Sequence, residues 1–192
     1  HDDKFIATAH EYNFFYAKYI NEAKTNYLPL EESDISTFKH SDELGNYRVR
    51  EFRRSGNNSS REARPKMFYP ILIKDNQIHF ITDDEYSKIH DSKSGKFDDN
   101  FLNQLKIKYT QEDFDFVLPI DSKNIYRVWR WSMGSLKERL TEVFADKKED
   151  GYLLKTKDRL SNKEGLKPKS VWYKPKYTSA LGTKLISNLF EE

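Results

Sequence analysis

A short polar segment, residues 53–66, carries the side chains with the most recognisable chemistry in this sequence. Arginine can donate two parallel hydrogen bonds to a guanine edge, and asparagine can pair in the same bidentate way with adenine. Glycine and serine between them favour turns, so we expect an exposed, mobile loop. The alternative is an ordinary solvent loop without a partner. The candidate base-contacting residues are Arg53, Arg54, Asn57, Asn58, Arg61, Arg64 and Lys66.

A second basic stretch lies near the C-terminus. The net charge of +2 hides this segregation. Residues 48–66 hold seven Lys or Arg against two acids, residues 75–115 hold ten acids against five Lys, and residues 151–178 hold eight Lys or Arg against two acids. If folding joins the two basic blocks, they form a surface that attracts phosphates; otherwise they are ordinary solvated faces. The basic charges of residues 151–178 are mostly lysines, which suit contacts with backbone phosphates. The candidate residues are Lys155, Lys157, Arg159, Lys167, Lys169, Lys174 and Lys176.

Acidic residues offer a competing chemistry. Asp113, Asp115 and Asp121 could bind a metal ion beside Lys123, as in a small metal-dependent nuclease. Carboxylates at such spacing also arise by chance in a chain that is 33% charged. The three tryptophans, Trp129, Trp131 and Trp172, could stack on an extruded base, but aromatic residues in β-rich runs are more often core.

Composition narrows the class of protein. A chain of 192 residues with 36% hydrophobic and 15% aromatic residues suits one soluble, globular domain. The absence of cysteine and of a long apolar run fits the cytoplasm and no membrane contact. No glycine-rich phosphate loop, Gly-x-Ser-x-Gly elbow or HExxH motif is present, so signals for an enzyme are sparse.

Hydrophobic spacing predicts the elements that position these groups. The β-rich runs 67–73 and 77–82 flank Asp75 and Asn76, which predicts a hairpin, with the first strand at a sheet edge because of Pro70. The other expected strands cover residues 11–19 (buried), 47–52, 114–120, 125–131, 152–156 and 170–173. The expected helices cover residues 33–41, 83–90, 98–108, 132–145 and 181–190.

These elements indicate the fold class. Strands and helices are mixed, the links are short and hairpin-like, and alternating βαβ units are missing. We therefore expect an α+β fold: a mixed, largely antiparallel sheet or sheets with flanking helices, in a single domain.

Four segments, in the right order, resemble type III modification methyltransferases, the β-class DNA adenine-N6 enzymes. KFIATAHEYNFFYAK (residues 4–18) resembles a strand region that follows the family's catalytic motif. RPKMFYPI (64–71) resembles its Arg-Pro-x-x-x-Tyr-Pro-Ile element, and VWRWS (128–132) its Trp-Arg-Trp segment. KPKSVWYKPKYTSALGTKLISNLF (167–190) resembles the Gly-Thr helix that precedes its cofactor domain. The resemblance covers almost the whole chain.

The resemblance implies a division of labour with the rest of a larger enzyme. In this family a target-recognition region lies between a catalytic Asp-Pro-Pro-Tyr motif and a Phe-x-Gly-x-Gly loop that binds S-adenosylmethionine, and neither motif occurs here. Residues 1–20 are then a remnant of the catalytic domain, and residues 21–192 a domain that recognises a short sequence in double-stranded DNA.

This chain alone is expected to be inactive and to bind no cofactor. The parent enzyme would use S-adenosylmethionine and assemble with a restriction subunit and a second modification subunit. A protein-interaction domain is the third alternative.

Overall fold

The computed structural model describes residues 14–149, 151–171 and 179–190. The chain divides into two compact units. The sheet domain comprises Glu31–Lys163, and the terminal unit combines His1–Leu30 with Glu164–Glu192. No helix among the described residues has the length and apolar character needed to cross a membrane.

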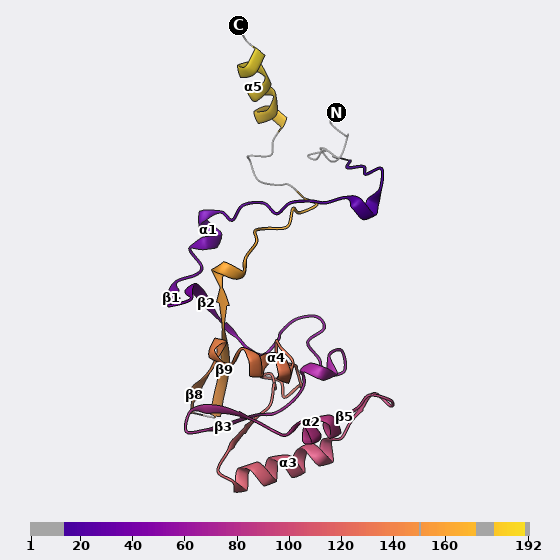
Figure 1. Ribbon diagram of the computed structural model, residues 1–192, viewed down its shortest axis with the longest axis vertical. Coiled ribbons are helices and arrows are strands. Elements are labelled where there is room, and N and C mark those ends of the chain that lie inside the picture. The colour runs from indigo at the N-terminus through magenta and orange to yellow at the C-terminus, as the bar shows by residue number, and fades with distance from the viewer. Residues whose placement is uncertain (1–13, 150, 172–178, 191–192) are drawn as a thin grey trace, which may run out of the picture. The chain divides into compact units, whose positions relative to one another are not determined.

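A four-stranded antiparallel sheet pairs the beginning of the first basic stretch with the beginning of the second. Its order is β1-β2-β9-β8, so β9 lies between β2 and β8 (Figure 1). Tyr47 is opposite Arg159 and Glu51 is opposite Lys155 in the β2–β9 register. The strands are β1 (His40–Asp42), β2 (Gly45–Glu51), β8 (Val143–Lys148) and β9 (Gly151–Arg159).

A second antiparallel sheet has the order β4-β3-β7 and consists of β3 (Ile71–Lys74), β4 (Gln77–Phe80) and β7 (Asp115–Val117). Asp75 and Asn76 have φ values of 51° and 62°, the left-handed backbone that a two-residue hairpin turn requires. The predicted hairpin is confirmed. The predicted edge position is wrong, because β3 is central and Pro70 precedes it, where no ladder N–H is needed.

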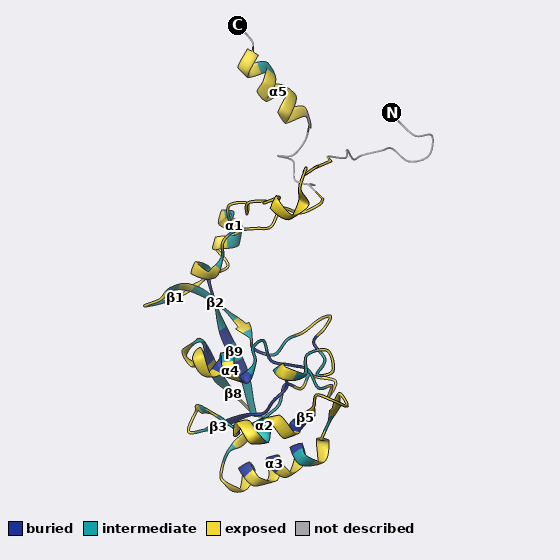
Figure 2. Ribbon diagram, turned by 45° about the vertical axis from the view of Figure 1, so that its right-hand side comes forward, coloured by how far each residue is buried: buried dark blue, intermediate teal, exposed yellow. Residues whose placement is uncertain are grey.

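Helix α3 packs against β7 of the second sheet and α2 packs against α3, and three of the helices begin at recognisable caps. Thr82 and Glu85 form a reciprocal capping box at α2, while Asp98 and Ser132 accept hydrogen bonds at the starts of α3 and α4. The buried positions of α3 lie on one side of the helix (Figure 2). The helices are α1 (Glu32–Ile35), α2 (Asp83–Ile89), α3 (Asp99–Gln111), α4 (Met133–Glu138) and α5 (Ser179–Phe190).

The remaining short elements are single 3₁₀ turns and one small hairpin. The turns are η1 (Ile20–Glu22), η2 (Pro65–Met67), η3 (Leu140–Glu142) and η4 (Leu160–Asn162). The hairpin pairs β5 (His90–Asp91) with β6 (Lys96–Phe97).

Aromatic residues form the centre of the core. Phe52 stacks on Trp129 with ring centroids 5.5 Å apart and meets Trp131 edge-on at 5.4 Å. The Trp129 indole N–H donates to the Tyr69 carbonyl oxygen at 2.7 Å, which satisfies its one polar atom. Trp129 is buried and Trp131 half-buried, so both are core residues, whereas Trp172 lies outside the described residues.

The α+β class, with antiparallel sheets and flanking helices, is confirmed. The helix expected over residues 132–145 is confirmed only to Glu138. Val143 and Phe144 belong to β8 instead, because Val143 pairs with Thr156 of β9 and is buried there. The prediction of a buried strand at residues 11–19 is wrong for the residues that the structure describes. Phe14, Phe15 and Tyr16 are exposed and belong to no strand.

Several predicted boundaries also moved. The strand expected at 152–156 extends over all of β9, and the helix at 181–190 begins at Ser179 as α5. The helix expected at residues 33–41 is a single turn, α1. Of the strand expected at 170–173, residues 170 and 171 are not in a strand, and the rest lies outside the described residues.

Within the terminal unit, two distant segments are joined by backbone pairing. The Leu28 N–H donates to the Leu166 carbonyl at 2.8 Å, and the Leu166 N–H donates back at 2.9 Å. Gly165 makes this approach feasible, since a Cβ at this position would lie 2.5 Å from the Leu28 oxygen. Its φ of +136° also disfavours any other residue.

Thr156 provides a test of this packing. Its buried hydroxyl has no hydrogen-bond partner among the described residues, and such a group costs free energy. Thr156→Val should raise the free energy of unfolding in urea by about 1 kcal/mol. Thr110→Val, at an exposed position of α3, is the control and should change it by less than about 0.5 kcal/mol. A loss of stability in Thr156→Val would contradict the unpaired state of the hydroxyl.

Glu85 should make stability depend on pH. Burial acts to raise the pKa of its carboxyl, but hydrogen bonds from Lys108, Thr82 and Tyr109 prevail and bring the pKa to about 2. A folded pKa below the ordinary 4.5 means that this stabilisation is complete above pH 4.5 and is lost as the pH falls toward about 2. Glu85→Gln should be less stable at neutral pH and show a flatter profile over that window in urea titrations. The exposed Glu138→Gln should keep the wild-type profile; identical profiles for all three proteins would disprove the prediction.

Candidate nucleic-acid interface

The basic loop (residues 53–66) is fixed to the domain at several points. Arg53 forms an isolated bridge with Trp129, and Ser60 forms one with Arg127. The buried Ser59 hydroxyl donates to the Gly56 carbonyl at 2.7 Å and accepts from Arg127 at 3.3 Å. The loop is therefore an ordered turn rather than the unanchored segment that its composition suggests.

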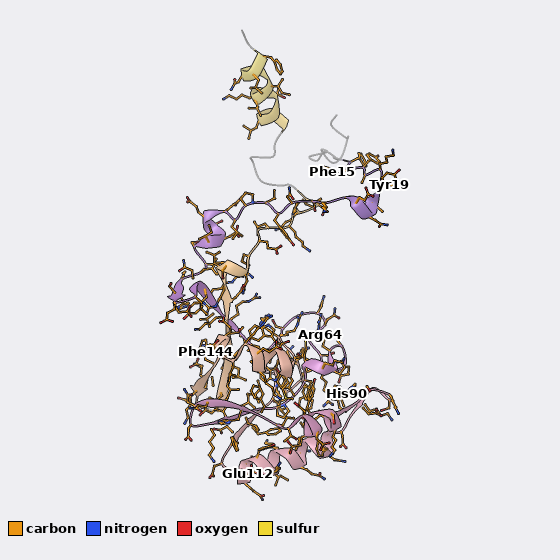
Figure 3. The ribbon with its side chains drawn as sticks, viewed as in Figure 1. Phe15, Tyr19, Arg64, His90, Glu112 and Phe144 are labelled. Carbon is orange, nitrogen blue, oxygen red and sulfur yellow. The ribbon has the colours of Figure 1, made fainter. Side chains whose placement is uncertain are left out.

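The tip of the basic loop presents polar side chains to solvent. Asn57 and Asn58 are both exposed, and Asn58 adopts a left-handed φ of 57°. Arg64 lies next to η2 (Figure 3). Its guanidinium donates to the Asn58 carbonyl at 3.1 Å and holds the turn. Lys66 is exposed beyond it. Of these predicted residues, Arg64 contacts Asn58, and Asn57, Asn58 and Lys66 are exposed.

Arg61 serves the loop's own structure. Its side chain is only 13% exposed and forms two parallel hydrogen bonds with the Asp99 carboxylate. The guanidinium lies over the rings of Phe97 and Tyr126, 4.6 and 4.4 Å from their centroids. The hydrogen bonds to Asp99 raise the pKa of Arg61 and those from Arg61 lower the pKa of Asp99, so this ion pair is persistently charged.

Carboxylates of the protein itself neutralise the cations of β9. Lys155 pairs with Asp146 at 2.6 Å and Lys157 with Asp42 at 2.7 Å. Arg159, whose side chain is 7% exposed, binds both Asp42 and Glu142. Hydrogen bonds to Asp42, and to a lesser extent to Glu142, raise the pKa of Arg159. Hydrogen bonds from Arg159 and Lys157 lower the pKa of Asp42. Arg53 is likewise held, 2.6 Å from Glu51.

Apart from Arg54, the predicted cations not yet described belong to the terminal unit. Lys167 and Lys169 are exposed there. Lys174 and Lys176 lie outside the described residues.

Three arginines form a group that the sequence analysis did not assemble. This arginine cluster consists of Arg50, at the end of β2, Arg54, at the start of the basic loop, and Arg130, in the Trp-Arg-Trp segment. Backbone pairing places them together: the Arg54 N–H donates to Val128 at 2.8 Å and the Arg130 N–H to Phe52 at 3.0 Å. Arg130 was missed because its tryptophan neighbours suggest a core strand; the basic residue between them was the available signal.

The acidic residues considered for a nuclease have other roles. Asp121 accepts from the backbone N–H of Ile125 and from Arg127, which, despite desolvation, bring its pKa to about 2. Asp113 occupies a left-handed turn after α3, and Asp115 is exposed on β7. Among the described residues, no group of three His, Asp or Glu could hold a metal ion. The geometry offers no support for a metal centre with Lys123.

The hollows of the surface lie elsewhere. A concavity of about 480 Å³ beside the start of α3 is lined by Lys88, Asp91, Lys96, Phe97 and Asp98, among others. Charges of both signs line it, and none of the predicted site residues takes part. It does not resemble a pocket for a flipped base, which needs apolar or aromatic walls.

Two curated proteins are similar to the chain over nearly its whole length. One is the type III restriction-modification enzyme EcoPI Mod subunit of Escherichia phage P1, 27% identical over 193 residues, which are 98% of this chain and 26% of that protein. The other is the type II methyltransferase M.KpnI of Klebsiella pneumoniae, 29% identical over 186 residues, 96% of this chain and 37% of that protein. No family model matches the chain, and no solved structure matches it.

These relatives define the class of protein to which the chain is similar. They connect it with restriction-modification methyltransferases, as the sequence motifs indicate. One is type III and the other type II, so the type stays a prediction. The chain spans about a quarter of one relative and little more than a third of the other.

Arg61 can be tested as the anchor of the basic loop. Arg61→Ala removes a charge-assisted pair and the ring contacts, and should lower the free energy of unfolding by about 2 kcal/mol. Urea denaturation gives this value directly. Lys66→Ala, in the same loop but exposed, should change it by less than about 0.5 kcal/mol. Equal small losses in both variants would show that Arg61 does not hold the loop.

Proposed function

We propose that the chain is the DNA-binding target-recognition region of a type III restriction-modification adenine-N6 DNA methyltransferase. It would read a short duplex sequence so that the parent enzyme methylates one adenine. The observation that carries this proposal is the similarity to two restriction-modification methyltransferases along 96% to 98% of the chain. The ordered basic loop adds a physical means of reading DNA.

Within the proposal, the tip of the basic loop reads bases. Amide side chains can pair with an adenine edge in the major groove, and Asn57 is exposed at the tip. Arg64 and Lys66 would contact the same stretch of duplex. Arg53 and Arg61 would mainly hold the loop in shape, because each already binds a carboxylate.

The lysines of β9 and the terminal unit would contact phosphates. Lys155 and Lys157 would have to exchange Asp146 and Asp42 for a phosphate, and Arg159 is too enclosed to do so easily. Lys167 and Lys169 are exposed residues of the terminal unit. Backbone contacts of this kind supply affinity on any duplex and carry no sequence information.

The parent enzyme would use S-adenosylmethionine, which the described residues do not fit. A methyl-donor loop needs closely spaced glycines, and no two of the seven glycines in the chain are neighbours or next neighbours. We therefore assign no step of methyl transfer to this chain. The proposed parent acts in the cytoplasm with a restriction subunit and a second modification subunit, and residues 1–20 belong to its catalytic domain.

Selection from a pool of randomised duplexes tests this function. The full chain should enrich one short motif, since exposed amides at the loop tip discriminate among base edges. Asn57→Ala should weaken discrimination at one position of that motif by about tenfold, as expected for the loss of one bidentate contact. Enrichment sequencing and anisotropy titrations of the selected duplex measure both effects.

The control is Asn103→Ala, which removes an exposed amide from α3. It should enrich the same motif with the same preference as the wild type. A wild-type chain that binds every duplex equally, or none in low salt, would refute the recognition function.

A further inference from the structure

We propose that the arginine cluster (Arg50, Arg54 and Arg130) binds one phosphate group of the DNA backbone and thereby positions the basic loop. The inference rests on the proposed function and deepens it, because it separates the group that fixes the register of the duplex from the groups that read it. No catalytic step is involved.

The backbone around the cluster is rigid. Residues 52–54 pair with residues 128–130 through three features: the Arg53–Trp129 bridge and the two hydrogen bonds that join Arg54 to Val128 and Arg130 to Phe52. Phe52, Val128 and Trp129 are fully or almost fully buried, so this pairing cannot slide without opening the core. The three arginine side chains therefore project from backbone positions that the fold fixes.

Arg130 is oriented by a further contact. Its Nε donates to the Glu51 carbonyl oxygen at 2.6 Å. The terminal nitrogens then keep their donor capacity, because a guanidinium carries five N–H groups. No other hydrogen bond from this side chain occurs within the described part of the chain.

Two of the three arginines in the cluster have no carboxylate partner among the described residues, unlike several other arginines of the domain. Arg48, Arg127 and Arg159 each lie within 3 Å of an acidic oxygen. Across the described residues, neither Arg54 nor Arg130 forms an ion pair. Arg50 forms a long ion pair with Asp158, at 3.5 Å.

That acid is already engaged with other cations. Asp158 accepts from Arg48 at 2.9 Å and pairs with Lys163 at 2.8 Å. Asp158 shares its single negative charge among three cations, so it offsets the charge of Arg50 only in part.

Like charges in the cluster destabilise one another. Burial and then the proximity of Arg50 and Arg54 lower the pKa of Arg130, against the smaller opposing influence of Glu51 and Asp158. Holding three guanidinium groups together beside a single, shared acid costs free energy that a bound anion would recover. Planar guanidinium forks match the oxygens of a phosphate, which makes a phosphate the best-suited anion.

The position of the cluster favours a phosphate in DNA. Arg54 is part of the basic loop, three residues before Asn57. Phosphate contacts fix a protein's register on the duplex while base contacts specify sequence. A phosphate held at the foot of the loop would bring its tip to a defined place beside the neighbouring base edges.

Salt titration distinguishes a phosphate contact from a base contact. We expect Arg54→Gln and Arg130→Gln to lower affinity for selected and unselected duplexes by the same factor. The slope of log K against log salt should become less steep by about 0.9 for the lost phosphate contact. The motif enriched from the random pool should not change. Lys106→Gln, an exposed cation of α3, is the control and should keep the wild-type slope.

Arg54→Lys guards against an indirect effect on folding. The substitution keeps the charge, so it should recover most of the affinity lost in Arg54→Gln. Urea denaturation of all variants checks that they fold. Because the Arg130 side chain also contacts Glu51, the Arg54 pair decides the question if Arg130→Gln unfolds.

Inorganic phosphate provides a second probe of the full chain. At constant ionic strength it should raise the midpoint of thermal unfolding more for the wild type than for Arg54→Gln. An Arg54→Gln protein with wild-type affinity and salt slope would overturn the cluster assignment while leaving DNA recognition intact. A wild-type chain that is stabilised by phosphate and binds no duplex would overturn both the proposed function and the DNA backbone as the source of the phosphate.

Discussion

The stacking of Phe52 on Trp129 is the contact on which the arrangement of the sheet domain depends. It holds the end of β2 against residues 128–130, and the Trp129 N–H ties that segment to Tyr69, two residues before β3. The first sheet, the second sheet and the start of the basic loop thus meet at one buried aromatic group. Any displacement there would move all three, because a close-packed interior transmits small shifts.

Charge pairing is the second constraint. The chain contains nearly equal numbers of basic and acidic residues, 33 and 31, and the fold uses many of its acids to neutralise specific cations. Asp42, Glu142 and Asp146 serve β9, while Asp99 serves Arg61. What distinguishes a cation as a candidate for an external anion is therefore the absence of an internal acid, and the number of basic residues in a segment is a poor guide.

Local signals predicted much of the fold. The Asp75–Asn76 turn and the helices expected at residues 83–90 and 98–108 were predicted because each depends on a few adjacent residues. The strand at residues 143–145 was not, because the spacing there fits a helix while pairing with β9 makes these residues part of β8.

The site was less predictable for the same reason. Arg159 and Asp42 are 117 residues apart, and Arg61 and Asp99 are 38 apart, so only the folded chain reveals which charges cancel. The exposed amides of the basic loop were predictable, since turn-forming residues keep them at the surface. Arg130 was not, because its proposed role depends on its proximity to Arg50 of β2 and Arg54 of the basic loop.

The pairing of Leu28 with Leu166 has a consequence for how such a protein can diversify. The sheet domain occupies the sequence between these two residues, so the polypeptide departs from and comes back to a single hydrogen-bonded pair. A domain whose two ends are adjacent can be replaced by another, because the rest of the protein keeps the same pair of connections. Gly165 permits the close approach of the two connections and so marks the position at which one such domain could replace another.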